Sequence, residues 1–324
     1  MLVYLLLILG FLLLIKGADF FVDGSSSVAK ILRIPTIIIG LTVVAFGTSL
    51  PEASVSITAS LLGKNDLAVS NVIGSNIFNL LFILGACAFL GNIKAKWSIL
   101  KKEFPFSIII TIVLFVLLSG LSFAPMLAGE GTYTLTRIGG IVLLTLFVIF
   151  LVSTVRDALK ARAEIKDVPP ENDYQTLSPV KSGIYILVGL VGIVWGGDLV
   201  VNSASEIATR FGLSQTFIGL TIVALGTSLP ELVTSIIAAK KGENDLAIGN
   251  VIGSNIFNIL LILGVSATIS PITVSVTAIY DILFLIFASI LGYICTISKQ
   301  LISKVEGTIF LVTYTGYFIY ILMR

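Results

Sequence analysis

Histidine is absent from this chain of 324 residues, and only 12% of its residues are charged. Without imidazole the chain can build neither a histidine-ligated metal centre nor a histidine proton relay near neutral pH. Soluble domains usually carry about 25% charged residues. Here 56% of the residues are hydrophobic, and apolar runs of about 20 residues, each long enough to cross a bilayer, follow one another. The sequence therefore predicts a protein that crosses the lipid bilayer several times.

Cysteine and net charge are also scarce. The net charge of +2 is too small and dispersed to indicate nucleic-acid binding. Cys87 and Cys295 are the only cysteines, and both fall in apolar segments, which favours small buried side chains over a disulfide or a metal pair. We expect no cofactor and no obligate protein partner. Because the first apolar segment lacks a positively charged leader, we expect it to be a retained span.

Hydropathy and helix breakers predict ten transmembrane helices in an all-α membrane protein. They fall near residues 2–22, 36–61, 67–90, 104–124, 136–155, 182–203, 214–239, 246–270, 274–296 and 302–323. The longest polar interval, 156–181, is too short to bury a core of its own and is predicted to be a linker.

The chain repeats itself with an offset of 179 residues. GLTVVAFGTSLPE at 40–52 matches GLTIVALGTSLPE at 219–231 in eleven of 13 positions. GKNDLAVSNVIGSNIFNL at 63–80 matches GENDLAIGNVIGSNIFNI at 242–259 in fourteen of 18. These matches predict a first five-helix repeat over 1–155 (motifs 40–80) and a second over 182–324 (motifs 219–259).

Five spans per repeat make the second copy enter the membrane from the opposite side, which predicts two inverted-topology repeats. The basic residues agree with this. Fifteen of the 20 Lys and Arg residues fall after odd-numbered spans or in the linker, and four fall on the other side: Lys64, Arg137, Arg210 and Arg324. The positive-inside rule then predicts a multi-pass protein of the cell membrane with both termini extracellular and linker 156–181 cytoplasmic.

GTSLPE puts a proline and a carboxylate inside a predicted span of each repeat. Pro51 and Pro230 interrupt the helical hydrogen bonds, and freed carbonyl oxygens at membrane depth need protein, water or an ion as a partner. Glu52 and Glu231 follow directly, and a charge at the bilayer centre costs about 3 kcal/mol. No Lys or Arg is predicted at that depth, so we expect the partner to be a cation or a proton.

A four-residue spacing aligns further oxygen-bearing side chains on single helix faces. The aligned sets are Thr48, Glu52 and Ser56; Thr227, Glu231 and Ser235; Asn71, Ser75 and Asn79; and Asn250, Ser254 and Asn258. Carboxylate, hydroxyl and amide oxygens without sulfur or imidazole suit hard cations such as Ca²⁺ or Na⁺.

Other roles remain open for several of these polar residues. Any single Ser or Thr could only bond its own helix backbone or join two helices. Asn76 and Asn255, one position off the stripe, could be helix-packing amides. Asp19, Asp23 and Asp198 could be interfacial residues or part of an ion vestibule.

The paired GTSLPE and GNVIGSNIFN motifs resemble the α-repeats of the sodium/calcium exchanger family, within the cation/Ca²⁺ antiporter superfamily, and the match covers essentially the whole chain. The resemblance implies an electrogenic antiporter, with Ca²⁺ and Na⁺ as its substrates, that works by alternating access at a midplane site. It implies the following ion ligands: Glu52 and Glu231; the side chains of Thr48, Ser49, Ser75, Asn79, Thr227, Ser228, Ser254 and Asn258; and the carbonyls of Ala45 and Ala224. It also implies that spans 1 and 6 are a long pair that slides against the other helices.

Two relatives of that family stay open as alternatives. Potassium-dependent exchangers resemble this chain but carry Asp where it has Asn258. The proton-coupled branch resembles it too but carries a histidine beside its glutamate. A K⁺-dependent or H⁺/Ca²⁺ exchanger is therefore disfavoured but not excluded. A cation channel fits the doubled, broken helices less well. An intramembrane enzyme lacks a nucleophile–base pair, so we expect no catalytic activity.

Overall fold

The computed structural model describes residues 2–120, 129, 131–165, 177–212, 224–297 and 299–323. Eight described helices are long and apolar enough to cross a membrane, or nine if Thr36–Thr48 and Leu50–Leu61 form one broken span. The protein is therefore a mostly helical, multi-pass membrane protein. Residues 121–124, at the end of predicted span 104–124, residues 214–223, at the start of predicted span 214–239, and linker residues 166–176 lie outside the described part of the chain.

The eight long spans follow the predicted segments closely, with their ends shifted by a few residues to about ten. They are Leu2–Leu32, Asn65–Leu90, Ile99–Ser119, Arg137–Ala163, Pro179–Arg210, Asn244–Ile269, Val276–Ile297 and Lys304–Met323. The largest differences are extensions. Helix α1 (Leu2–Leu32) continues ten residues past its expected end, and α10 (Arg137–Ile165) continues into the predicted linker.

The chain divides into two compact units that do not coincide with the two sequence repeats. Unit 1 comprises Met1–Leu50 and Phe150–Gly253, and unit 2 comprises Pro51–Ile149 and Ser254–Arg324. Each unit thus combines segments from both repeats, and two of the three boundaries, 50/51 and 253/254, fall inside the repeated motifs.

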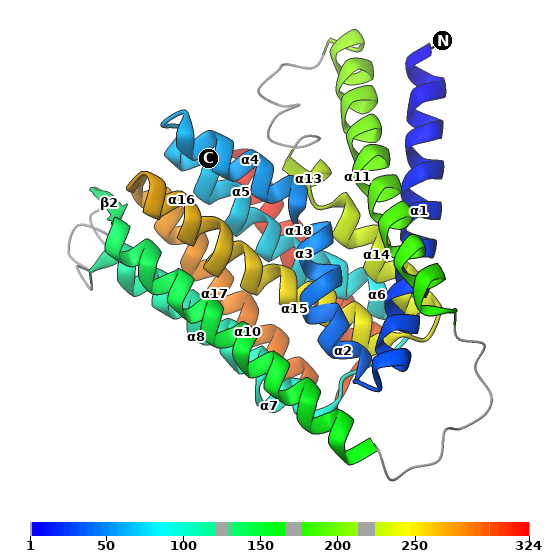
Figure 1. The fold of residues 1–324 in the computed structure, drawn as a ribbon. Coiled ribbons are helices and arrows are strands. Elements are labelled where there is room, and N and C mark those ends of the chain that lie inside the picture. The colour runs from blue at the N-terminus through cyan, green and yellow to red at the C-terminus, as the bar shows by residue number, and fades with distance from the viewer. Residues whose placement is uncertain are drawn as a thin grey trace. The chain divides into compact units, whose positions relative to one another are not determined.

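Unit 1 is built around α1 and α11 (Pro179–Arg210), which lie side by side (Figure 1). They are antiparallel, because Gly10, Gly17 and Gly24 meet α11 at progressively earlier residues. A Cβ added to Gly17 would lie 2.7 Å from the main-chain nitrogen of Ile193. Only glycine allows the two backbones to approach this closely.

Unit 1 also contains α2 (Thr36–Ile39), α3 (Ala45–Thr48), α13 (Ala224–Gly226), α14 (Leu229–Lys240) and the first ten residues of α15 (Asn244–Phe257). Apolar side chains of α1 and α11 form its core with residues of α14 and α15, and Leu14, Phe21 and Ile193 are almost completely buried.

Unit 2 contains α4 (Leu50–Leu61, from Pro51), α5 (Asn65–Ile77), α6 (Leu84–Leu90), α7 (Trp97–Lys101), α8 (Glu103–Ser119), α16 (Gly264–Ile269), α17 (Val276–Ile297) and α18 (Lys304–Met323). An aromatic cluster joins two of its spans: Phe78 and Phe82 stack on each other, and the ring of Tyr314 packs edge-on against both.

The all-α expectation misses four short strands among the described residues, all in unit 2. β1 (Ile93–Lys94) pairs antiparallel with β4 (Leu301–Ile302). β2 (Thr132–Leu135) pairs antiparallel with β3 (Ile272–Ser275), with Thr132 opposite Ser275. Runs of two to four residues carry too little periodicity to be distinguished from loops between spans.

Three described helices contain π-helical segments, which the sequence did not reveal. They are η1 (Gly40–Val44), η2 (Phe78–Ile83) and η4 (Asn258–Leu263). The last two contain Asn79 and Asn258, which are equivalent positions of the two repeats. A π-turn inserts one extra residue into the helical ladder and recurs at functional sites. Both stripe asparagines therefore lie where the helical register changes.

Candidate ion-binding residues

Unit 1 surrounds Glu231 with neutral oxygen-bearing side chains. Glu231 lies in the first turn of α14, directly after Pro230, and is completely buried. Ser49, which ends α3, donates a hydrogen bond from Oγ to Glu231 Oε1 at 2.9 Å. The break in the helix at Ser49, where ψ is 6°, places this hydroxyl beside a carboxylate 182 residues away in sequence.

Thr48 contacts both its own helical segment and α15. Its Oγ1 donates to Asn250 Oδ1 at 3.0 Å and also lies 3.1 Å from the carbonyl oxygen of Val44 and 3.4 Å from that of Ala45. The Ala45 carbonyl additionally accepts the Ser49 N–H at 3.0 Å. The structure therefore brings together Ala45, Thr48, Ser49 and Glu231 of the predicted set.

Asn250 fixes the main chain that carries Glu231. Its Nδ2 donates to Ser235 Oγ at 2.9 Å and to the Glu231 carbonyl at 3.4 Å. Asn250 thus holds two successive turns of α14 and receives the Thr48 hydroxyl on its other amide atom. From the sequence, Asn250 was expected only as a member of a polar stripe. In the structure it holds the main chain that carries Glu231.

Unit 2 repeats this arrangement around Glu52. Glu52 is completely buried in the first turn of α4. Asn71 Nδ2 donates to Ser56 Oγ at 2.9 Å and to the Glu52 carbonyl at 3.4 Å. These distances equal those around Asn250, because the same residues recur at the same spacing. Ser75 Oγ lies 3.3 Å from Glu52 Oε1.

A network of amides connects Ser75 to the stripe asparagines. Asn258 Nδ2 donates to Ser75 Oγ at 3.2 Å and to Asn76 Oδ1 at 3.0 Å. Asn79 Nδ2 donates to Asn255 Oδ1 at 3.2 Å. Asn76 and Asn255 each donate to the other's main-chain oxygen, at 3.2 and 3.3 Å. These two residues are therefore the helix-packing amides that the sequence left as one of two readings.

Among the buried side-chain oxygens that have no hydrogen-bond partner within the described part of the chain are three that belong to predicted ligands in unit 2. They are Asn79 Oδ1, Asn258 Oδ1 and Ser254 Oγ, and each belongs to a residue that is completely buried. A buried polar oxygen without a partner costs about 1–3 kcal/mol. All three are acceptors suited to a hard cation, so this donor set fits Na⁺ or Ca²⁺ as a substrate.

The remaining predicted ligands lie beside the same helix break of repeat two. Thr227 and Ser228 form the turn between α13 and α14, with Ser228 buried, and Ala224 begins α13. In the described ranges, no three Asp, Glu or Cys side chains gather in one place. Neutral oxygens therefore outnumber carboxylates around each glutamate.

The aspartates of α1 have partners near the loop after α14. Lys241 Nζ lies 2.6 Å from Asp19 Oδ1 and 2.7 Å from Asp23 Oδ1. Partial burial alone would lower the pKa of Lys241, but the hydrogen bonds and charges of both aspartates outweigh it and raise that pKa. These contacts favour the interfacial reading of Asp19 and Asp23.

Comparison with known proteins shows the family to which the chain belongs. The profile of the sodium/calcium exchanger protein family matches residues 2–156 and 181–323. The chain is 40% identical over 323 residues to CaxA of Alkalimonas amylolytica, provisionally named an antiporter, covering 96% of this chain and 95% of the relative. It is 30% identical to the sodium/calcium exchanger MaX1 of Methanosarcina acetivorans, covering 98% and 97%.

A solved structure of the sodium-calcium exchanger NCX_Mj, soaked with Na⁺ and without Ca²⁺, has a TM-score of 0.80 at 32% identity, covering 97% of each chain. The family profile spans both halves of the chain, and both GTSLPE motifs lie within the matched residues. The chain therefore belongs to the sodium/calcium exchanger family, whose members are ion-transporting antiporters rather than enzymes.

Proposed function

We propose that this protein exchanges Na⁺ for Ca²⁺ by alternating access, with Glu52 and Glu231 as the carboxylates that the transported ions neutralise. The observation that carries the proposal is the equivalent surroundings of the two glutamates. Each is completely buried behind a helix break, and each is contacted by a serine hydroxyl. The remaining ligands would be Thr48, Ser49, Ser75, Asn79, Thr227, Ser228, Ser254, Asn258 and the carbonyls of Ala45 and Ala224.

Charge explains why transport would be coupled. Two bare carboxylates in a low-dielectric region cost several kcal/mol. Ca²⁺ neutralises both, and so do Na⁺ ions in sufficient number. A conformational change with both glutamates uncompensated is correspondingly rare, so the protein changes face with ions bound. Exchange rather than leak follows from this penalty.

The proposed topology is ten helices in two inverted repeats, with both termini outside and linker 156–181 in the cytoplasm. Reciprocal contacts between α1 and α11 support it. Gly10 packs on Gly196, and Gly17 packs on Gly189. Adding 179 to Gly10 and Gly17 gives Gly189 and Gly196, so each contact is the image of the other under exchange of the repeats, as a two-fold axis requires.

The decisive experiment is Ca²⁺ uptake into proteoliposomes loaded with Na⁺ and diluted into Na⁺-free buffer. We expect uptake that requires internal Na⁺ and is lost in Glu52→Gln and Glu231→Gln. Glu206→Gln is the matched control, because Glu206 is exposed on α11 and pairs with Arg210. Full uptake by either buried-site variant would contradict the site.

Further conditions of the same uptake experiment distinguish Na⁺/Ca²⁺ exchange from the other transport mechanisms. Uptake that needs added K⁺ would indicate a K⁺-dependent exchanger, and uptake driven by an imposed pH gradient would indicate H⁺/Ca²⁺ exchange. Uptake that follows voltage without any counter-ion would indicate a channel. For topology, a cysteine introduced at Asn172 in the linker should react with a membrane-impermeant maleimide only after the cells are opened.

A further inference from the structure

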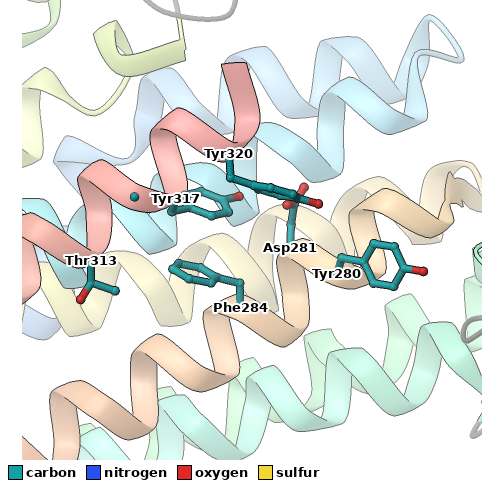
Figure 2. A pocket seen from close by; sticks show the side chains of 7 residues that line it. Tyr280, Asp281, Phe284, Thr313, Tyr317 and Tyr320 are labelled. Atoms are coloured by element: carbon teal, nitrogen blue, oxygen red, sulfur yellow. The ribbon is translucent and has the colours of Figure 1, made fainter. Parts of the chain in front are cut away.

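A cavity of about 410 Å³ lies between α17 and α18 in unit 2 and has no place in the ion-exchange site. Figure 2 shows Asp281 and Phe284 projecting from α17 toward Tyr317 and Tyr320 of α18. Asp281 is only 4% exposed, although it belongs to a helix long and apolar enough to cross the membrane. The volume of the cavity is within the range of pockets that hold small organic molecules.

The lining combines one carboxylate with aromatic rings. Phe284 and Tyr317 stack with their centroids 4.4 Å apart, and Tyr320 lies 6.4 Å from Tyr317. Aromatic faces attract cations, most strongly where water is excluded, and recognition of organic ammonium groups is the usual functional use of such rings. An adjacent carboxylate adds charge complementarity. The lining chemistry therefore selects an organic ammonium group.

The position of the cavity along the helices indicates where that ammonium comes from. Asp281 is five residues after the first residue of α17, about 7.5 Å along the helix at 1.5 Å per residue. Tyr320 is three residues before the last residue of α18, at the same end of this antiparallel pair. The end of the cavity that holds Asp281 and Tyr320 is therefore within two helical turns of these helix ends, and Thr313, ten residues before the last residue of α18, lines its deeper part.

We propose that this cavity binds the headgroup of an amine-bearing lipid such as phosphatidylethanolamine, with Asp281 pairing with the ammonium and the neighbouring rings of Phe284, Tyr317 and Tyr320 lining its site. The proposal is independent of which ions the protein exchanges, because none of these residues belongs to the ion site.

Gly316 provides a direct way to close the cavity. It lines the cavity on α18, and a Cβ added there would meet no atom within 4 Å. Gly316→Leu therefore fills the space without displacing the backbone. Gly183→Leu is the matched control, because Gly183 of α11 also has no atom within 4 Å of an added Cβ and lies far from the cavity in sequence.

The test is native mass spectrometry of the full-length, delipidated protein titrated with phosphatidylethanolamine and with its N-acetylated form, which keeps the chains and phosphate but lacks the cation. We expect wild-type protein to prefer the amine lipid about tenfold, the factor that roughly 1.4 kcal/mol corresponds to. Gly183→Leu should keep that preference, and Asp281→Asn and Gly316→Leu should lose it. Equal binding of the two lipids by wild-type protein, or an unchanged preference in Gly316→Leu, would overturn the proposal.

A second arm separates a lipid from a free ammonium compound as the source. Saturation-transfer NMR would follow tetramethylammonium binding to the same delipidated protein. We expect weak or undetectable binding, because the soluble ion lacks acyl chains to bury. Saturable binding tighter than that of phosphatidylethanolamine would show that the cavity recognises a soluble ammonium compound and that the lipid assignment is wrong.

Discussion

Ser49 donates its hydroxyl hydrogen to Oε1 of Glu231 across 2.9 Å, although 182 residues separate the two in sequence. The hydrogen of this hydroxyl stabilises the carboxylate, and its oxygen lone pairs are the part that would contact a cation in the proposed site. Both groups are buried, so the bond operates away from bulk water.

We expect Ser49→Ala to raise the apparent Km for Ca²⁺ about tenfold, because a hydrogen bond to a charged group contributes about 1.5–3 kcal/mol. The measurement is Na⁺-driven Ca²⁺ uptake at a series of Ca²⁺ concentrations. Thr145→Ala is the control, since Thr145 is exposed on α10 and only bonds its own helix, at Ile141. An unchanged Km in Ser49→Ala would remove this hydroxyl from the site.

The effects of replacing Asn71 and Ser56 on stability should be coupled, because the two side chains are hydrogen-bonded to each other. Asn71→Ala leaves the Glu52 carbonyl and Ser56 Oγ without their donor, and the loss should lower the free energy of unfolding by about 1–3 kcal/mol. Ser56→Ala should lower it by less, and the double variant should lose less than the sum of the two. Thermal melting of the three variants in detergent measures this coupling. Strict additivity would show that the contact contributes nothing.

The equivalent variant of the second repeat should behave alike. Asn250→Ala removes the same pair of contacts from Ser235 and the Glu231 carbonyl, and also the acceptor of Thr48. We therefore expect a loss of unfolding free energy at least as large as that of Asn71→Ala, measured in the same melting series. A smaller loss would mean that Asn250 contributes less to stability than Asn71, although the two positions are equivalent in the repeats.

Asn258→Asp tests the role of the amide hydrogens. The carboxylate cannot donate to Ser75 Oγ or Asn76 Oδ1, as Asn258 Nδ2 does at 3.2 and 3.0 Å. The melting temperature should fall, and Na⁺-driven Ca²⁺ exchange should weaken. Replacement by Gln, which keeps the amide but lengthens the side chain, separates the loss of donors from a change in shape. Exchange that stays normal in Asn258→Asp would show that the amide network is dispensable.

Lys241→Gln should destabilise the protein only slightly. Its ion pairs with Asp19 and Asp23 are partly exposed, and such pairs contribute up to about 1 kcal/mol each. Because both aspartates raise the pKa of Lys241 above its usual value of 10.5, the stabilisation is present at neutral pH and is lost only as the pH rises through the higher folded-state value. Melting at pH 7 should therefore distinguish Lys241→Gln from wild type. Lys64→Gln, at an exposed loop position, is the control.

Gly17→Leu should prevent assembly of α1 with α11. Its side chain would have to occupy space only 2.7 Å from the main-chain nitrogen of Ile193, and no rotamer removes a clash that begins at Cβ. We expect little folded protein in a size-exclusion profile. Gly183→Leu on α11 meets no neighbour and should behave like wild type. A monodisperse, transport-competent Gly17→Leu would contradict the described packing.

The family, the membrane spans and the two buried glutamates were predictable from the sequence, because hydropathy is a property of 20-residue windows and the repeat is read directly from identical motifs. The hydrogen-bond partners of each glutamate could not be predicted from the sequence. Ser49 and Glu231 belong to different repeats, and only the fold shows that they touch. The π-turns at Asn79 and Asn258 change the helical register, so a four-residue stripe projected along a regular helix misplaces its last member. Asp281 escaped notice because it has no counterpart in the repeated motifs.

The glycines of α1 are seven residues apart, at Gly10, Gly17 and Gly24, and each lies against the main chain of α11. A slip by one turn would bring Leu14 or Phe21 to a place where even a methyl group does not fit. The next permitted register is a whole period away, about 10.5 Å at 1.5 Å per residue, which is a distance that thermal fluctuation of packed helices does not cover. We therefore expect the two longest described helices to move together as one body rather than to slide along each other.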